Sequence, residues 1–283
     1  MSEAVPLVIT GAGGRLGRLL RCLWPEALDR RLAPVWFARN SQIPGVFAWD
    51  MGREPAPELP RGAVILHLAG SVATLAEYRA SVVAICAAAD AGGARHLFVA
   101  SSAAVYRPQV QDNREDTPPD PPNAYGLAKL DAEQAARAAI GQATPSGTGL
   151  TLLRIGNIAG ADALLGGNAP GRRVVLDPVP GQNGPERSYI APTVLAGVFS
   201  QLAGLAVAAA ALPLILNVAQ PGRIAMGDLL DAAGRDWGFG PPSDTVLPRL
   251  TLNTDRLAAL LPLPATSAKK QVADLAGLAG RGP

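Results

Sequence analysis

Short apolar runs alternate with longer helical patterns over the first 157 residues of the chain. Patterns of buried strands occur at residues 6–10, 34–38, 46–49, 63–68, 96–100 and 150–155. A helical pattern follows the first strand, and two more cover residues 76–91 and 125–140. Continuous apolar strands separated by helices are typical of a parallel sheet that is covered on both faces. The pattern therefore predicts an α/β protein with a doubly wound sheet.

Beyond residue 157 the pattern becomes irregular. Residues 161–186 are rich in Gly and Pro, and a helix–strand–helix series then runs to the C-terminus. We expect a dinucleotide-binding core over residues 1–157, for the reasons given below, and a smaller substrate-binding region over residues 158–283, partly interleaved with the core. Within the core, residues 107–123 are rich in Pro and acidic residues and are expected to form a loop.

Composition narrows the classes of function. The 283 residues are 48% hydrophobic and 17% charged with a net charge of +2, which gives no electrostatic case for a nucleic-acid or membrane partner. Cys22 and Cys86 cannot build a disulfide framework, and His67 and His96 lie far from both, so we expect no metal site. The sequence shows neither a secretory signal pattern nor an apolar run of spanning character. We expect a cytoplasmic protein that acts on a small molecule.

The sequence TGAGGRLG at residues 10–17 joins the first strand pattern to the first helix pattern. Glycines at positions 11, 14 and 17 permit positive φ and let a phosphate approach the backbone. The following helix N-terminus presents free N–H groups and a partial positive charge to a pyrophosphate. The spacing G-x-x-G-x-x-G differs from the standard G-x-G-x-x-G fingerprint. Between a strand and a helix, it nevertheless predicts a dinucleotide-binding loop.

The residue that follows the second strand bears on the choice of cofactor. An acid at this position would bind the 2′-hydroxyl of NAD, but the strand ends in Phe37, Ala38, Arg39 and Asn40. Arg39, assisted by Arg15 in the glycine loop, could pair with the 2′-phosphate of NADP. The sequence therefore slightly favours NADP and leaves NAD open, because Arg39 could also be an ordinary solvated side chain.

A serine, a tyrosine and a lysine form the candidate catalytic group. Ser102 follows a buried strand, and Tyr125 and Lys129 lie four residues apart on one helix face. A neighbouring ammonium lowers the pKa of a phenol, so Tyr125 can exchange a proton with a substrate hydroxyl or carbonyl that Ser102 orients. The other lysines are Lys269 and Lys270, so a lysine at position 129 stands out in an arginine-rich chain. Hydride would pass to or from a nicotinamide.

Several further sequence motifs occur besides the glycine loop and the Ser–Tyr–Lys group. They are Asp50-Met51, His67-Leu68-Ala69-Gly70, VASSAAVY at 99–106, YGLAK at 125–129 with Glu133, LRIGN at 153–157, GQNGPERSYI at 181–190 and LNV at 216–218. Together with the glycine loop, they resemble the extended short-chain dehydrogenase/reductases, specifically the NAD-dependent epimerase/dehydratase family that includes UDP-galactose 4-epimerase. The resemblance is strong to residue 157 and looser beyond, and it implies a Rossmann-like fold.

The resemblance extends the set of expected site residues. The expected cofactor-binding residues, including those of the glycine loop and Arg39 described above, are Gly11, Gly14, Arg15, Leu16, Gly17, Arg39, Asp50, Met51, Leu68, Ala69, Gly70, Tyr125, Lys129 and Ile155. It implies substrate contacts at Ser102, Asn157 and Arg187. It also implies a homodimer formed through the helices at 76–91 and 125–140.

Departures from the family pattern fall mainly on substrate recognition. Ala103 and Ala104 stand where the 4,6-dehydratases of the family carry an acid pair, which disfavours dehydration. The family asparagine is missing from the helix at 76–91, where Tyr78 and its neighbours stand. The leading hypothesis is epimerase-like hydride transfer on a sugar or nucleotide sugar. The alternative is an NADP-dependent reductase or dehydrogenase of a smaller carbonyl compound, and a non-catalytic dinucleotide sensor is disfavoured by the intact Ser–Tyr–Lys set.

Overall fold

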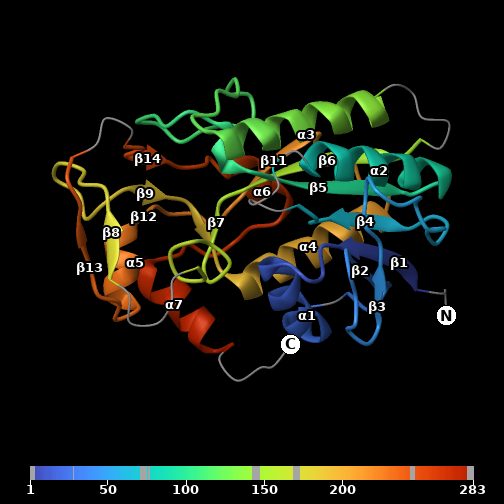
Figure 1. Ribbon diagram of the computed structural model, residues 1–283, viewed down its shortest axis with the longest axis horizontal. Helices are drawn as coiled ribbons and strands as arrows, with labels where there is room; N and C mark the ends of the chain where they lie inside the picture. Colours follow the sequence, from blue (N-terminus) through green and yellow to red (C-terminus); the bar gives the residue numbers. More distant parts are fainter. Residues whose placement is uncertain are drawn as a thin grey trace.

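A parallel sheet forms the centre of the molecule (Figure 1). The structure is a computed structural model that describes residues 4–27, 29–70, 75, 77–141, 147–167, 173–242 and 246–278. Within these residues the sheet has seven strands in the order β11-β6-β5-β4-β1-β2-β3, every neighbouring pair being parallel. The strands are β1 (Val5–Thr10), β2 (Leu32–Ala38), β3 (Val46–Ala48), β4 (Val64–His67), β5 (His96–Ser102), β6 (Gly149–Ile155) and β11 (Ile215–Val218). All six strands predicted from the apolar runs are confirmed.

Two pairs of helices cover the two faces of the sheet. In Figure 1, α2 (Glu77–Ala91) and α3 (Ala124–Gly141) lie above the sheet, and α1 (Arg15–Ala27) and α4 (Pro192–Val207) lie below it. Each pair buries its own apolar cluster against the strands, which explains why the strands read as continuous apolar runs. The predicted doubly wound, Rossmann-like α/β fold is confirmed.

The strand order places the glycine loop at a crevice. The chain starts at β1 in the sheet, adds β2 and β3 on one side, and then continues with β4, β5 and β6 on the other. The loops that follow β1 and β4 therefore diverge at the carboxyl ends of adjacent strands, where open α/β sheets bind their ligands. Thr10 pairs in register with His67 across these two strands, so both motifs reach the same edge.

The chain beyond β6 builds short elements at one end of the sheet, on the left of Figure 1. Small sheets there join β7 to β10, β8 to β13, and β9 to both β12 and β14. These strands are β7 (Asn157–Ile158), β8 (Val174–Leu176), β9 (Glu186–Arg187), β10 (Tyr189–Ile190), β12 (Ile224–Ala225), β13 (Trp237–Phe239) and β14 (Arg249–Leu250). The helices are the 3-10 helix η1 (Ala103–Val105), which precedes this region, and α5 (Met226–Ala232), α6 (Asp255–Leu260) and α7 (Ala268–Ala276).

Two sequence-based expectations for this region have different outcomes. Residues 161–186 are not wholly irregular, because β8 finds its partner β13 some sixty residues later, which no local pattern reveals. The domain division at residue 157 stays a prediction, although β11 and α4 do return to the main sheet after it. Among the described residues, no helix has the length and apolar character needed to cross a bilayer.

Candidate active site

The glycine loop is shaped by close backbone contacts. Gly11 has a φ of 81°, and a Cβ at this residue would lie 2.9 Å from the backbone nitrogen of Ala69. A Cβ at Gly17 would lie only 2.1 Å from the carbonyl oxygen of Gly11. The first turn of α1 therefore rests directly on the loop backbone. Glycine is required at both positions, as the dinucleotide-binding interpretation expects.

A buried histidine ties the ends of β1 and β4 together. The Thr10 hydroxyl accepts hydrogen bonds from the backbone N–H groups of Leu68 and Ala69 and lies 2.9 Å from Nδ1 of His67. Burial lowers the pKa of His67 to about 3, and the nearby Lys129 charge adds to this effect. A neutral imidazole can accept the Thr10 hydrogen at Nδ1. His67 is a packed residue at the end of its strand, and it fixes the loop behind the crevice.

A cleft of about 370 Å³ opens beside the glycine loop. It is lined by these cofactor residues expected from the sequence: Gly11, Gly14, Arg39, Asp50, Met51, Leu68, Ala69 and Gly70. Residues that the sequence did not single out also line it, and they are Gly13, Phe37, Ala38, Asn40, Trp49, Glu77 and Ser81. The expected residues outside its lining are Arg15, Leu16, Gly17, Tyr125, Lys129 and Ile155. The glycine backbone and the N-terminus of α1 suit the phosphates of a dinucleotide, and the carboxylates of Asp50 and Glu77 suit its hydroxyls.

Arg39 is not free to receive a phosphate. Its guanidinium forms an ion pair with Glu77 at the start of α2, and its Nε lies 3.6 Å from a carboxylate oxygen of Asp50. Arg53 joins the same group, 3.0 Å from Glu77. Two carboxylates thus face the position at which the sequence suggested a 2′-phosphate site. The predicted preference for NADP is not supported, because the sequence did not reveal that an acid from α2 reaches Arg39.

Helix α3 brings Tyr125 to the segment that follows Ser102. The Asn123 side chain accepts a hydrogen bond from the Gly126 N–H at 2.9 Å and caps the helix. A Cβ at Gly126 would lie 2.1 Å from the carbonyl oxygen of Ala104, so the helix packs directly on the backbone of η1. Interaction with Ser102 lowers the pKa of Tyr125, but burial has the larger effect and raises it. Ser102 and Tyr125 are therefore neighbours.

Lys129 is buried, with 7% of its surface exposed. Its Nζ donates a hydrogen bond of 2.9 Å to the carbonyl oxygen of Ala100 and lies 4.0 Å from the ring centroid of Tyr78. Burial lowers the pKa of Lys129 to about 7, although the Glu133 carboxylate opposes this shift. The sequence anticipated Lys129 beside Tyr125. It did not anticipate that an aromatic ring from α2 would cover the ammonium.

A second, larger cleft lies beyond η1, with a volume of about 750 Å³. The loop between β5 and α3 forms one wall through Pro108, Val110 and Pro121, and Leu247 and Pro248 form part of the opposite wall. Its two arginines are paired, Arg107 with Asp120 and Arg249 with Glu186. The cleft therefore offers mainly apolar surface.

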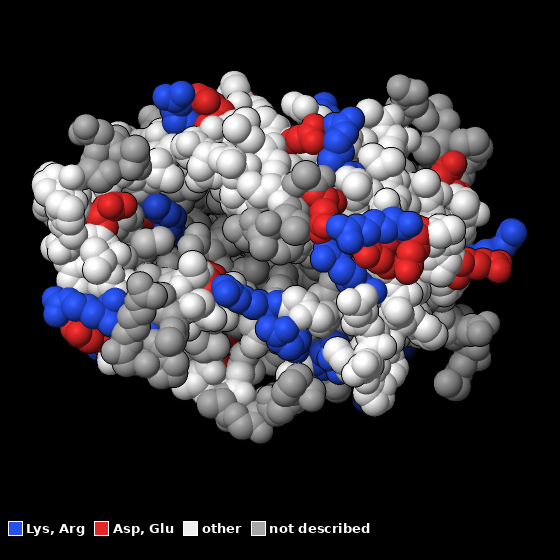
Figure 2. All heavy atoms as spheres, in the orientation of Figure 1, with Lys and Arg blue, Asp and Glu red and all other residues white. Residues whose placement is uncertain are grey.

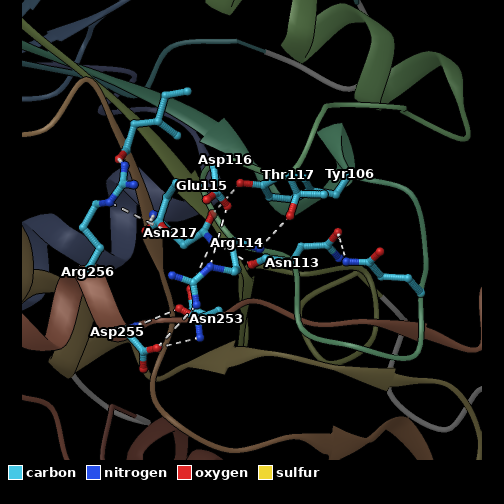
Figure 3. Close-up of polar contacts among 12 residues, drawn as sticks. Tyr106, Asn113, Arg114, Glu115, Asp116, Thr117, Asn217, Asn253, Asp255 and Arg256 are labelled. Atoms are coloured by element: carbon cyan, nitrogen blue, oxygen red, sulfur yellow. Dashed lines mark hydrogen bonds and ion pairs between the residues drawn. The ribbon is translucent and has the colours of Figure 1, made fainter.

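A buried polar network fixes this loop in place (Figure 3). Asn217 of β11 donates hydrogen bonds from its side chain to the carbonyl oxygens of Asn113 and Asn253, at 2.9 and 3.0 Å. Its side-chain oxygen accepts one from the Tyr106 hydroxyl, and its backbone N–H donates to Glu115. One asparagine thus joins the sheet, the loop and the C-terminal segment. The sequence marked Asn217 as a family motif but did not reveal these partners.

The remaining expected site residues lie near the same end of the sheet. Ile155 pairs in register with Ser102 on the adjacent strand. Asn157 begins β7, and its backbone N–H donates to the Ser188 carbonyl oxygen at 2.8 Å. Arg187 donates to the carbonyl oxygens of Glu186 and Leu247 and so joins β9 to the wall of the larger cleft. These bonds give Arg187 a structural function, and its substrate contact stays a prediction.

On the face drawn in Figure 2 most blue and red side chains lie beside one another, and a short row of blue side chains runs below the central hollow. Ion pairs between exposed arginines and acids account for this distribution, for example Arg79 with Asp131. Within the described residues, no group of three or more His, Cys, Asp or Glu side chains is arranged to hold a metal ion.

Comparison with known proteins shows a match to a family model over part of the chain and a similarity of fold over nearly all of it. Residues 62–174 match the model of the NAD dependent epimerase/dehydratase family, and no curated protein sequence matches the chain. The UDP-glucose-4-epimerase from Stenotrophomonas maltophila, solved with bound NAD and formylated UDP-arabinopyranose, has a TM-score of 0.74 at 18% identity, covering 95% of this chain and 96% of that chain. DesIV, a dTDP-glucose 4,6-dehydratase from Streptomyces venezuelae with NAD and TYD bound, has a TM-score of 0.69 at 17% identity over 98% of each chain.

A third similar structure is MoeE5 in complex with UDP-glucuronic acid and NAD, with a TM-score of 0.72 at 17% identity, covering 95% of this chain and 97% of that chain. The matching family is described as NAD dependent and these structures contain NAD, the cofactor that the sequence left open beside a slight preference for NADP. The resemblance is therefore confirmed: the chain matches the NAD dependent epimerase/dehydratase family over residues 62–174 and shares the fold of its enzymes along nearly its whole length.

Proposed function

We propose that this chain is an NAD-dependent enzyme that transfers hydride at a hydroxyl or carbonyl of a nucleotide sugar, with epimerase-like chemistry. The observation that carries the proposal is that Ser102 interacts with Tyr125, while the ring of Tyr78 contacts both Tyr125 and Lys129 and lies against Gly70 of the glycine-lined cleft. Relatives with the same fold hold NAD and nucleotide sugars. Ala103 and Ala104 provide no acid pair for dehydration, so epimerisation is favoured over elimination.

The ion pairs of Arg39 support NAD as the cofactor. A 2′-phosphate at this end of the cleft would face the carboxylates of Glu77 and Asp50, whereas a 2′-hydroxyl can donate a hydrogen bond to either. The glycine loop would hold the pyrophosphate, and Asp50 and Met51 would lie beside the adenosine. When bound, the nicotinamide accepts and returns hydride. Side chains of the protein bind and orient the substrate and transfer the proton.

Tyr125 is the proposed acid and base, and Ser102 orients the substrate oxygen. Burial raises the pKa of the Tyr125 phenol, so Tyr125 needs a neighbouring positive charge to act as a base. Lys129 would supply that charge within the buried group. Asn157 and Arg187 are proposed to contact the substrate, and Arg187 adjoins the larger cleft through its hydrogen bond to the Leu247 carbonyl oxygen.

The size of the larger cleft supports a nucleotide sugar over a small carbonyl compound. Its volume of about 750 Å³ lies in the range of pockets that hold drug-sized ligands. Pro121, one of its lining residues, lies against Gly126 next to Tyr125, so the cleft borders the catalytic group. The reacting sugar could therefore lie at Tyr125 while the rest of the substrate occupies this cleft.

We also propose a homodimer formed through α2 and α3. These helices lie together on one face of the sheet (Figure 1), and they expose Val83 and Leu127. A dimeric mass by light scattering at micromolar concentration is the expected result. A monomeric mass in the wild type would overturn this part of the proposal.

The test combines cofactor analysis with product analysis. Dinucleotide released from the purified protein is identified by mass spectrometry, and the protein is then incubated with UDP-glucose, UDP-galactose or UDP-glucuronic acid. We expect retained NAD and a stereoisomeric product without net change in absorbance at 340 nm. Stoichiometric consumption of NADPH with simple carbonyls, and no sugar product, would instead establish the reductase.

Variants test the catalytic group in the same assay. We expect Tyr125→Phe and Lys129→Met to lower kcat by at least about 100-fold, which is the scale of a general acid–base contribution. Lys269→Met is the matched control, since Lys269 is exposed, and it should retain wild-type turnover. Full turnover in Tyr125→Phe would refute the proposed mechanism.

A further inference from the structure

Tyr78 lies between the cofactor cleft and the catalytic group. Only 5% of its surface is exposed, and its ring meets three features of the site. The face of the ring lies 4.0 Å from Nζ of Lys129, and the ring packs edge-to-face with Tyr125 at a centroid distance of 6.3 Å. A Cβ at Gly70 would lie 1.9 Å from the ring, so this cleft-lining glycine leaves the space that Tyr78 fills.

The Lys129 ammonium has lost nearly all contact with water and needs other stabilisation. The Ala100 carbonyl oxygen satisfies one of its three hydrogens, and Glu133 on the same helix contributes a favourable charge. His67 faces it from β4 but is neutral, because burial lowers its pKa to about 3. The ring of Tyr78 also lies against the ammonium, and its negative π face attracts a cation.

We propose that Tyr78 is a positioning residue that holds the Lys129 ammonium in its charged form through the face of its ring. The backbone of Tyr78 is itself fixed, because the Ser81 hydroxyl donates to its carbonyl oxygen at 2.9 Å. The ring of Tyr78 also packs against Gly70, which lines the cofactor cleft. The consequence of this positioning for turnover rests on the proposed function.

The scarcity of lysine makes the test direct. Protein labelled with ε-¹³C lysine contains only Lys129, Lys269 and Lys270, so NMR titration follows each ammonium separately. Lys269 and Lys270 are exposed and serve as internal references. We expect Tyr78→Phe to keep the Lys129 midpoint within about 0.3 pH units, since Phe retains a π face. We expect Tyr78→Leu to lower it by about 0.5–1.5 units, the scale of a desolvated cation–π contact.

A second series covers the case in which Tyr78→Leu does not fold. Phenylalanines with increasing numbers of fluorine atoms, placed at position 78, keep the shape of the ring and weaken its negative face. The Lys129 midpoint should fall stepwise along this series. An unchanged midpoint across the series, or an equal shift in Tyr78→Phe and Tyr78→Leu, would overturn the proposal.

The titration needs no substrate, so its outcome is independent of the proposed function. In the active enzyme, a lower ammonium pKa means that the charge is lost at lower pH. The alkaline limb of kcat should therefore move to lower pH in Tyr78→Leu by the shift that the titration measures. A residue with only a structural function would lower kcat at every pH and leave this limb in place.

Discussion

Replacing Glu133 by Gln removes the negative charge from an ion pair buried between α3 and β6. Arg154 donates to both carboxylate oxygens of Glu133, at 3.0 and 2.8 Å, and each side chain is 3% exposed. Ser101 donates a further hydrogen bond to the same carboxylate. In Glu133→Gln the amide oxygen can still accept a hydrogen bond from Arg154, but no negative charge offsets the burial of the guanidinium, which also lies 4.7 Å from the ring centre of Tyr106.

The expected cost follows from this geometry. Removing one partner of a buried pair costs about 3–5 kcal/mol, because the other charge remains desolvated. For a domain of this size, that corresponds to a fall in Tm on the order of 10 °C. Asp131→Asn is the matched control on the same helix, since the Arg79–Asp131 pair is 57% and 47% exposed and contributes less than about 1 kcal/mol.

Calorimetry or circular dichroism at neutral pH measures both variants. A double variant that also replaces Arg154 by Met should recover part of the loss, because no uncompensated charge then remains. If Glu133→Gln unfolds within about 2 °C of Asp131→Asn, the pair does not stabilise the fold as argued.

Three further predictions concern the cofactor cleft and the dependence of stability on pH. Gly17→Ala should abolish NAD binding measured by calorimetry, because its Cβ would lie 2.1 Å from the Gly11 carbonyl oxygen and displace the loop; wild-type affinity would contradict this. Glu77→Gln should raise NADP affinity by up to about tenfold relative to NAD, since one of the carboxylates facing Arg39 loses its charge; an unchanged ratio would contradict it. His67, with a folded pKa of about 3, should contribute about 2 kcal/mol to the fall in the free energy of unfolding between pH 7 and pH 5, because unfolding frees it to take up a proton. The fall measured by urea unfolding should therefore be smaller by about this amount in His67→Gln, and an equal fall in both proteins would contradict the argument.

The sequence by itself determined the features that depend on neighbours along the chain. Apolar runs of strand length between helical patterns predicted the doubly wound sheet, because a strand buried on both faces must be apolar throughout. The steric need for glycine at residues 11 and 17 could be inferred from their spacing between a strand and a helix. Tyr125 and Lys129 could be placed on one helix face because the helical period is local.

The tertiary structure alone decided which charges and rings meet. Arg39 looked like a phosphate ligand in the sequence, but an ion pair with Glu77, 38 residues later, occupies it. In the sequence, Tyr78 was one of several residues in the helix that lacks the family asparagine, yet its ring covers Lys129, 51 positions further along the chain. Such pairings depend on how α2 packs across the carboxyl ends of the strands. A local pattern of residues carries no information about contacts between residues far apart in the chain, so the ion pairs of Arg39 and the surroundings of Lys129 followed only from the fold.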